Sequence, residues 1–153
     1  MVYFIGTDLE SEGGCASLDI NELMDSSVNT KDVNVVIYTG GCEHWQNGIP
    51  ADRNMFYFLR SNDSFESVAA TDSIYSMGNA ATIKDMLDFT AYYYPAEKYG
   101  LVCWDHGGGS ISGYGYDEKY ASAGSMTLKG ISEALKNAGR TKFDFIGFDA
   151  CLM

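Results

Sequence analysis

A histidine and a cysteine that could act together each follow a predicted strand. His106 comes soon after the apolar run that ends at Trp104, and Cys151 comes soon after the run that ends at Phe148. An imidazole beside a thiol lowers the thiol pKa, which creates a nucleophilic thiolate, and the ring can later protonate a leaving amine. Gly107 lets the backbone approach a substrate carbonyl and offer an N–H to the developing oxyanion, with the Cys151 N–H as a second donor. This chemistry is acyl transfer through a cysteine nucleophile, and it requires no metal.

The strands that must position this pair are predicted from short, uninterrupted apolar runs. Helical patterns separate the runs, and strands that alternate with helices favour a mostly parallel sheet of the α/β class. Right-handed crossovers bring the carboxyl ends of such strands to one edge, where sites in these sheets lie. We therefore expect His106 and Cys151 on neighbouring or near-neighbouring strands. The four core strands are predicted at Val2–Gly6, Val33–Tyr38, Tyr99–Trp104 and Phe143–Phe148.

Three helices are predicted between these strands. Apolar residues at helical spacing follow Asn79 and Thr127, which are good N-cap residues, and Pro95 ends the first of these two patterns. Residues 17–24 carry a weaker helical pattern, for which Ser17 is the expected cap.

A hairpin and a long loop complete the expected elements. Met55–Arg60 and Phe65–Ala70 flank the turn residues Ser61–Ser64, which predicts a peripheral antiparallel hairpin. Ser110–Ser125 contains several glycines and no hydrophobic periodicity, so it is predicted as a long exposed loop in which Lys119 is accessible.

Composition restricts the classes of function. The chain has 153 residues, the usual size of one domain, and 46% of them are hydrophobic, which excludes intrinsic disorder. Lys and Arg number 10 against 21 Asp and Glu, and the net charge of −11 repels phosphate, so no nucleic acid partner is expected. No uncharged stretch approaches the ~18 residues of a membrane span. The apolar residues after Met1 lack the basic start of a signal peptide.

Other functions fit parts of the pattern. His-Gly-Gly-Gly at 106–109 also occurs in lipases of the α/β-hydrolase class, but no Gly-x-Ser-x-Gly nucleophile motif is present. A dinucleotide-binding loop would follow a strand and open a helix, whereas the glycines at 107–113 are predicted to open a long loop. A catalytically inactive interaction domain on the same fold stays open. A lone cysteine is usually a small buried hydrophobe, which is our interpretation of Cys15, Cys42 and Cys103.

Two strings of residues resemble the catalytic motifs of the clostripain family of cysteine peptidases. They are WDHGGG at Trp104–Gly109 and FIGFDACLM at Phe145–Met153, in that order. Met1–Glu10 also resembles the family's first strand, and Tyr94–Tyr99 resembles its approach to the histidine strand.

This resemblance implies a caspase-like three-layer sandwich with a mostly parallel sheet, shared with gingipains, legumain and caspases. His106 and Cys151 would be the dyad of a cysteine endopeptidase that cleaves polypeptides after Arg or Lys. Asp149, two residues before the cysteine, would help to form the pocket for that basic side chain, because a carboxylate pairs bidentately with guanidinium. Asp105 is expected to orient a backbone amide. The resemblance also favours a secreted or cell-envelope bacterial protein.

Processing and calcium follow from the same resemblance. Relatives are processed at a basic residue, so a zymogen cut after Lys119 within Ser110–Ser125 is expected. Some family members depend on calcium, for which Asp8, Glu10 and Glu12 could supply oxygen ligands, although their spacing is not that of an EF-hand.

The family pattern continues beyond the cysteine with further strands and helices. Because only Leu152 and Met153 follow Cys151 in this sequence, we expect residues 1–153 to be the N-terminal portion of a single peptidase domain, with the missing C-terminal segment as its partner. The strand at Phe143–Phe148 would then leave an exposed apolar edge, and the chain alone would be neither stable nor active.

Overall fold

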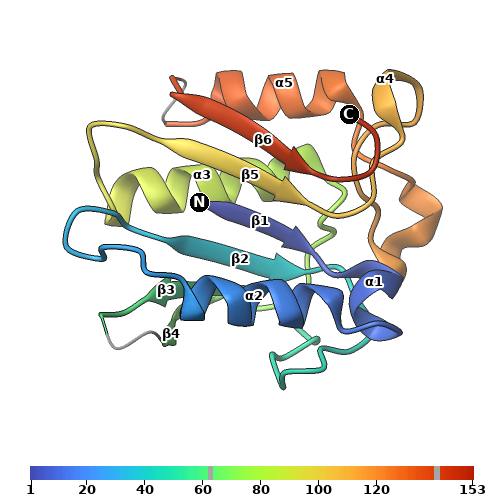
Figure 1. Cartoon of the computed structure of the whole chain (residues 1–153). Coiled ribbons are helices and arrows are strands. Elements are labelled where there is room, and N and C mark those ends of the chain that lie inside the picture. The colour runs from blue at the N-terminus through green and yellow to red at the C-terminus, as the bar shows by residue number, and fades with distance from the viewer. Residues whose placement is uncertain (62–63, 140–141) are drawn as a thin grey trace.

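The computed structural model describes residues 1–61, 64–139 and 142–153. Six strands form one mixed sheet in the order β4-β3-β2-β1-β5-β6 (Figure 1). The four predicted core strands are confirmed as a parallel set, because β1 is parallel to β2 and β5, and β5 is parallel to β6. The strands are β1 (Val2–Ile5), β2 (Val36–Gly40), β3 (Met55–Leu59), β4 (Phe65–Ala70), β5 (Gly100–Trp104) and β6 (Phe145–Asp149).

The predicted hairpin is confirmed at the edge of the sheet opposite β6, where β3 and β4 are antiparallel. Asn62 and Asp63 of its predicted turn lie outside the described residues. The predicted bounds of the second core strand are wrong, because β2 begins at Val36 and not at Val33. Val33 is 49% exposed, whereas Thr39 is buried and paired with both neighbouring strands.

The two strongest helix predictions are confirmed with their caps. The side chains of Asn79 and Thr127 each accept a backbone N–H of the first turn, at 2.9 and 3.0 Å. The cap predicted at Ser17 is wrong, because Gly14 precedes the helix with a left-handed φ of 65° and Ser17 is buried in the first turn. Within the described part of the chain, no helix is long and apolar enough to cross a membrane. The helices are α1 (Thr7–Ser11), α2 (Cys15–Asp25), α3 (Ala80–Tyr93), α4 (Gly109–Ser112), the 3-10 helix η1 (Glu118–Ala123) and α5 (Leu128–Asn137).

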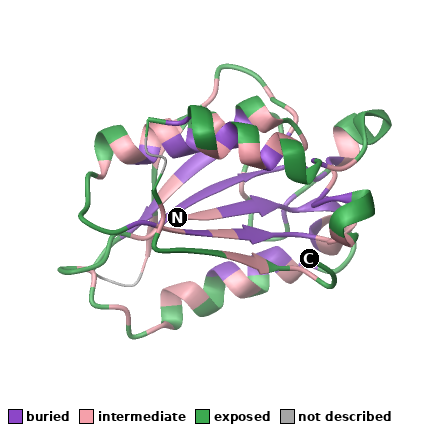
Figure 2. Ribbon diagram, turned by 90° about the horizontal axis from the view of Figure 1, so that it is seen from above, coloured by how far each residue is buried: buried purple, intermediate pink, exposed green. Residues whose placement is uncertain are grey.

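Helices cover both faces of the sheet, which gives three layers (Figure 2). On one face, α3 and α5 pack against a core that includes Tyr3 and Leu101. On the other face, α2 packs against Phe4 and Trp104. Tyr3 and Phe4 serve different layers because successive side chains of a strand point to opposite faces.

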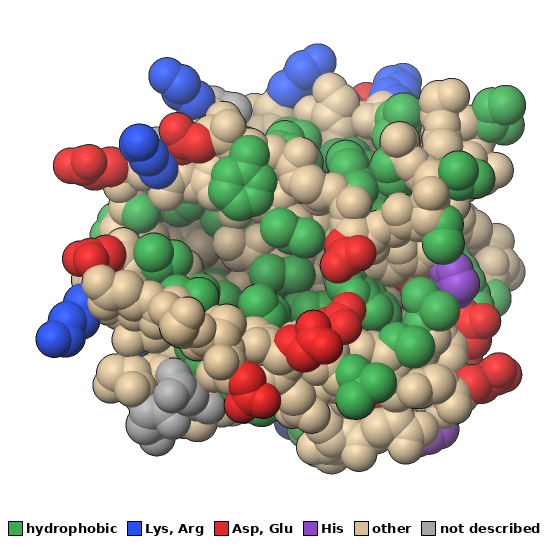
Figure 3. Space-filling model, in the orientation of Figure 1, with side chains coloured by type: hydrophobic (Ala, Val, Ile, Leu, Met, Phe, Trp, Pro, Cys, Tyr) green, Lys and Arg blue, Asp and Glu red, His purple; other side chains and the backbone are tan. Residues whose placement is uncertain are grey.

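The sheet presents an exposed apolar edge at β6, as expected. Phe145 and Ile146 are 59% and 41% exposed, and β6 pairs only with β5 among the described strands. The space-filling view shows hydrophobic side chains gathered on the sheet face above α2 (Figure 3).

The expectation of a long exposed loop at Ser110–Ser125 is wrong for much of that segment, which contains most of α4 and all of η1. Tyr114 is fully buried, with its hydroxyl 3.1 Å from the carbonyl oxygens of both Tyr3 and Trp104. Asp117 is also buried. Isolated buried residues anchor this segment, so it has no periodicity by which a pattern could predict it.

Candidate active site

The ends of β5 and β6 carry the two residues predicted as a dyad. Trp104 in β5 and Asp149 in β6 are register partners in this parallel pair of strands. His106 lies two residues beyond Trp104, and Cys151 lies two residues beyond Asp149. Asp105 N donates to the Asp149 carbonyl oxygen at 3.2 Å, which continues the pairing past β5. The structure therefore places His106 and Cys151 at one edge of the sheet on neighbouring strands.

Gly107 lies against the chain around Cys151. A Cβ at Gly107 would overlap the carbonyl oxygen of Leu152 and lie 3.0 Å from the Ala150 Cβ. The Gly109 N–H donates to the same Leu152 oxygen at 2.9 Å. The Gly107 N–H makes no hydrogen bond to another described residue, which leaves it available to a substrate oxygen. Its role as an oxyanion donor stays a prediction.

His106 contacts two residues that no local pattern in the sequence connects with it. Its Nε2 lies 2.9 Å from Asp8 Oδ1, and the Tyr116 hydroxyl donates to that same oxygen at 2.9 Å. The Tyr116 ring stacks on the imidazole with centroids 5.9 Å apart. The one signal in the sequence is that Asp8 follows a predicted strand as His106 does, but the sequence does not show that β1 and β5 are neighbours.

The environment of Asp8 favours its charged form. Partial burial alone raises the pKa of the carboxyl group, but hydrogen bonds from His106 and Tyr116 outweigh that effect and lower the pKa below its ordinary value. Asp8 is therefore ionised at neutral pH and can only accept hydrogen bonds.

Asp105, next to His106, makes hydrogen bonds from a buried position to two other segments of the chain. It is buried, and burial raises its pKa to about 7. Its Oδ2 accepts the Tyr116 N–H and its Oδ1 accepts the Thr7 hydroxyl, both at 2.9 Å. The expectation that Asp105 orients a backbone amide is confirmed.

Cys151 is the exposed one of the four cysteines, all of which are described and free. Cys103 is buried in the core as predicted, and burial raises its pKa to about 12, which keeps the thiol protonated and unreactive. Cys42 is also buried. No hydrogen bond joins the described side chains of Cys151 and His106, so the dyad itself stays a prediction.

Asp149 ends β6 with an exposed carboxylate. Among the described residues, this carboxylate has no hydrogen-bond or ion-pair partner. It is therefore free to meet a cationic side chain, although its predicted role in substrate binding is not tested by the structure.

Lys119 is less accessible than predicted. It is half-buried in η1, and its ammonium group donates to the carbonyl oxygen of Ala51. The backbone N–H of Lys119 donates to Asp117 Oδ1 at 2.9 Å. The expectation of an exposed loop tip is wrong because these contacts hold Lys119 against the rest of the domain, while cleavage after it stays a prediction.

The three acids considered for calcium have different surroundings. Glu10 is fully buried, with Oε1 accepting from Ser17 Oγ at 2.5 Å and from Gln46 N at 2.6 Å, and Oε2 accepting from Ser17 N at 2.8 Å. Asp8 binds His106, as described above, and Glu12 is exposed. Over residues 1–61, 64–139 and 142–153, no three His, Cys, Asp or Glu side chains are grouped to hold a metal ion. Calcium binding stays a prediction.

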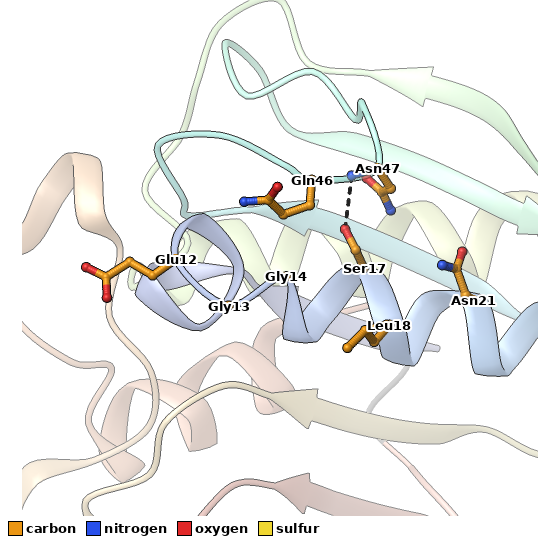
Figure 4. A pocket seen from close by; sticks show the side chains of 8 residues that line it. All are labelled: Glu12, Gly13, Gly14, Ser17, Leu18, Asn21, Gln46 and Asn47. Atoms are coloured by element: carbon orange, nitrogen blue, oxygen red, sulfur yellow. Dashed lines mark hydrogen bonds between the residues drawn. The ribbon is translucent and has the colours of Figure 1, made fainter.

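A shallow polar hollow of about 440 Å³ lies beside α2 (Figure 4). The Asn47 N–H donates to Ser17 Oγ within it, at 3.2 Å. This hollow belongs to α2 and its neighbours and not to the strand ends that carry the predicted dyad. It is lined by Glu12, Gly13, Gly14, Ser17, Leu18, Asn21, Gln46 and Asn47.

Solved structures of C11 cysteine proteases are similar to this chain. A secreted C11 cysteine protease from Bacteroides thetaiotaomicron, in complex with an irreversible peptide inhibitor, is 25% identical with a TM-score of 0.71. An inactive zymogen C11 protease from Parabacteroides distasonis is 26% identical with a TM-score of 0.68. The matches cover 98% of this chain and 41% and 40% of those chains, so this chain spans about two fifths of their length.

A further structure of a secreted C11 cysteine protease from B. thetaiotaomicron, "iotapain", is 16% identical with a TM-score of 0.69 and shows the shared fold alone. That match covers 98% of this chain and 44% of the other. These neighbours confirm the predicted caspase-like α/β fold. No curated protein matches the chain significantly. The model of the clostripain family matches residues 2–153, and the chain therefore belongs to the clostripain family of cysteine proteases.

Proposed function

We propose that the protein is a cysteine endopeptidase in which Cys151 is the nucleophile and His106 is the acid/base. The observation that carries this proposal is the register of β5 and β6, which puts both residues two positions beyond the Trp104–Asp149 pair. His106 accepts the thiol proton, and the thiolate attacks the substrate carbonyl carbon. The N–H groups of Gly107 and Cys151 stabilise the oxyanion, and His106 returns the proton to the leaving amine. Water then hydrolyses the thioester.

Substitution of the dyad in the full-length protein tests this mechanism. Cys151→Ala should abolish peptide hydrolysis, and His106→Ala should lower kcat by about 10²-fold or more. Cys15→Ala is the matched control and should hydrolyse peptides at the wild-type rate. Wild-type turnover by the Cys151 variant would contradict the proposed nucleophile.

We also propose that the enzyme cleaves after Arg or Lys, with Asp149 binding the basic side chain. The carboxylate at the end of β6 supports this assignment because it is exposed, has no partner among the described residues and lies two residues before Cys151. Asp149→Asn should lower kcat/KM for Arg and Lys substrates while changing that for a Leu substrate little. Asp25→Asn, which alters an exposed acid at the end of α2, is the matched control. Equal hydrolysis of Arg, Leu and Asp substrates by the wild type would exclude this specificity.

Residues 1–153 are proposed to be the N-terminal portion of a longer peptidase domain, secreted from a bacterial cell. The two-fifths coverage of the solved relatives and the exposure of Phe145 and Ile146 support the longer domain. Secretion is proposed because the similar protease from B. thetaiotaomicron is a secreted one. The downstream segment would cover the apolar surface at β6. Residues 1–153 alone should melt without cooperativity and hydrolyse no Arg or Lys substrate, and adding the downstream segment should restore both properties. Cooperative melting with turnover by the short chain would contradict the proposal.

A further inference from the structure

We infer that Asp8 and Tyr116 are positioning residues for His106: Asp8 holds the imidazole as the Nε2–H tautomer, and Tyr116 holds Asp8. The ring nitrogen that remains for proton transfer with the thiol is then Nδ1. This inference rests on the proposed function of His106, but the contact itself can be measured without any turnover.

The sheet brings Asp8 and His106 together from distant parts of the sequence. Phe4 in β1 is the register partner of Trp104 in β5, so the chain after β1 and the chain after β5 leave the sheet at the same edge. Asp8 lies in the short helix α1, directly beyond β1. Its Oδ1 is 2.9 Å from His106 Nε2.

Hydrogen-bond chemistry fixes the direction of this contact. An ionised carboxylate has no proton to donate, so His106 Nε2 must carry the hydrogen. A neutral imidazole has only one N–H, which leaves the lone pair on Nδ1. A histidine that must accept a thiol proton is therefore set to accept it at Nδ1.

Tyr116 restrains Asp8 and the imidazole together. Its hydroxyl donates to Asp8 Oδ1 at 2.9 Å while its ring stacks on His106 with 14° between the planes. Burial, followed by the hydrogen bond and the charge of Asp8, raises the pKa of Tyr116 to about 12, so the hydroxyl keeps its proton at neutral pH. Tyr116 therefore remains a donor throughout the working range of a peptidase.

Asp105 links the segment that carries Tyr116 to the segment that carries Asp8. It accepts the Tyr116 N–H at one carboxyl oxygen and the Thr7 hydroxyl at the other. Thr7 has a φ of 50°, which a threonine adopts only where its surroundings impose it, and it directly precedes Asp8. The turn from β1 into α1 is thus held in the conformation that directs Asp8 toward His106.

The tautomer is measurable by NMR on protein labelled with nitrogen-15 histidine. The sample is the full-length protein, and the signals of His44 and His106 are assigned as those that disappear in His44→Gln and in His106→Gln. In the wild type, neutral His106 should be the Nε2–H form. In Asp8→Asn, the amide can donate to Nε2, so the Nδ1–H form should appear. His44 contacts Gln46 and not Asp8, so its signals should not change and serve as an internal control.

Kinetics of the full-length protein supply the second readout. Asp8→Asn should lower kcat by about 10- to 100-fold with little change in KM, because a wrong tautomer impairs proton transfer and not binding. Asp8→Glu keeps the acceptor and should recover part of the loss, and Tyr116→Phe should show a smaller loss than Asp8→Asn. Asp25→Asn is the matched control and should leave both the tautomer and kcat unchanged.

The two readouts separate the inference from the proposed function. An Asp8→Asn protein that folds with native circular dichroism and keeps His106 as the Nε2–H form would overturn the inference. Equal kcat for the wild type and Asp8→Asn would also overturn it. A tautomer change in a protein that has no Cys151-dependent turnover would instead support the contact and refute the peptidase assignment.

Discussion

Replacing Gly107 with alanine tests how closely the two strand ends of the proposed active site are packed. The added Cβ would overlap the Leu152 carbonyl oxygen and lie 3.0 Å from the Ala150 Cβ. The Leu152 oxygen belongs to the backbone and accepts a hydrogen bond from Gly109, so it cannot rotate away. Overpacking of this kind costs about 1–3 kcal/mol. At ~2–4 °C per kcal/mol, the melting temperature should fall by roughly 2–12 °C.

A second glycine supplies the control for this experiment. Gly147 lies in β6, and a Cβ there would be 3.9 Å from Val102 Cγ2, an ordinary van der Waals contact. Gly147→Ala should therefore change stability by less than about 1 kcal/mol. Thermal melts and peptide hydrolysis by the full-length protein should show lower Tm and kcat for Gly107→Ala only, because that change separates His106 from Cys151. A Gly107→Ala protein with wild-type melting and turnover would refute the packing argument.

Three further predictions follow from buried or anchored side chains. The pKa of Asp105 is about 7 in the folded protein, against ~3.9 in an unfolded chain, so its stabilising contribution is complete below about pH 4 and is lost as pH rises to about 7. In Asp105→Asn, the free energy of unfolding should therefore depend less on pH between about pH 4 and 7 than it does in the wild type. The same pH dependence in both proteins, measured by urea denaturation, would contradict this. Glu10→Gln should destabilise the fold by about 1–3 kcal/mol in urea melts, because one amide oxygen cannot satisfy all the donors that surround Glu10, and an unchanged midpoint would contradict this. If maturation cuts after Lys119, N-terminal sequencing of the active protein should find a chain that begins at Tyr120, and Lys119→Ala should remove it. Full activity in an uncut protein would show that this processing is unnecessary.

Local patterns predicted the core of this fold well. The apolar runs at β1 and β5 each belong to buried strands, and the cap and spacing after Asn79 predicted α3. These features depend on neighbours within a few residues, so the sequence contains them directly.

The contacts that organise the proposed site are long-range, and local patterns could not predict them. Asp8 and His106 approach each other because β1 and β5 pair, and a sequence does not show strand order. Tyr114 is buried, with its hydroxyl hydrogen-bonded to β1 and β5, although it lies in a segment without periodicity. Lys119 was predicted to be accessible because its hydrogen-bond partner, the carbonyl oxygen of Ala51, lies far away in the sequence.

The order of strands in the sheet also governs when the proposed active centre can form during synthesis. β1 is made first, but its neighbour β5 is made only after the hairpin and α3, and pairing Tyr3 with Cys103 closes a long loop. Such closures are slow, and an unpaired strand edge is prone to aggregation until they occur. His106 meets Asp8 only at that step, and Cys151 joins them only when β6 has paired with β5. In a ribosome-bound chain, the two proposed catalytic residues therefore stay on unpaired segments until β6 has been translated and has paired with β5, so the proposed dyad cannot form any earlier.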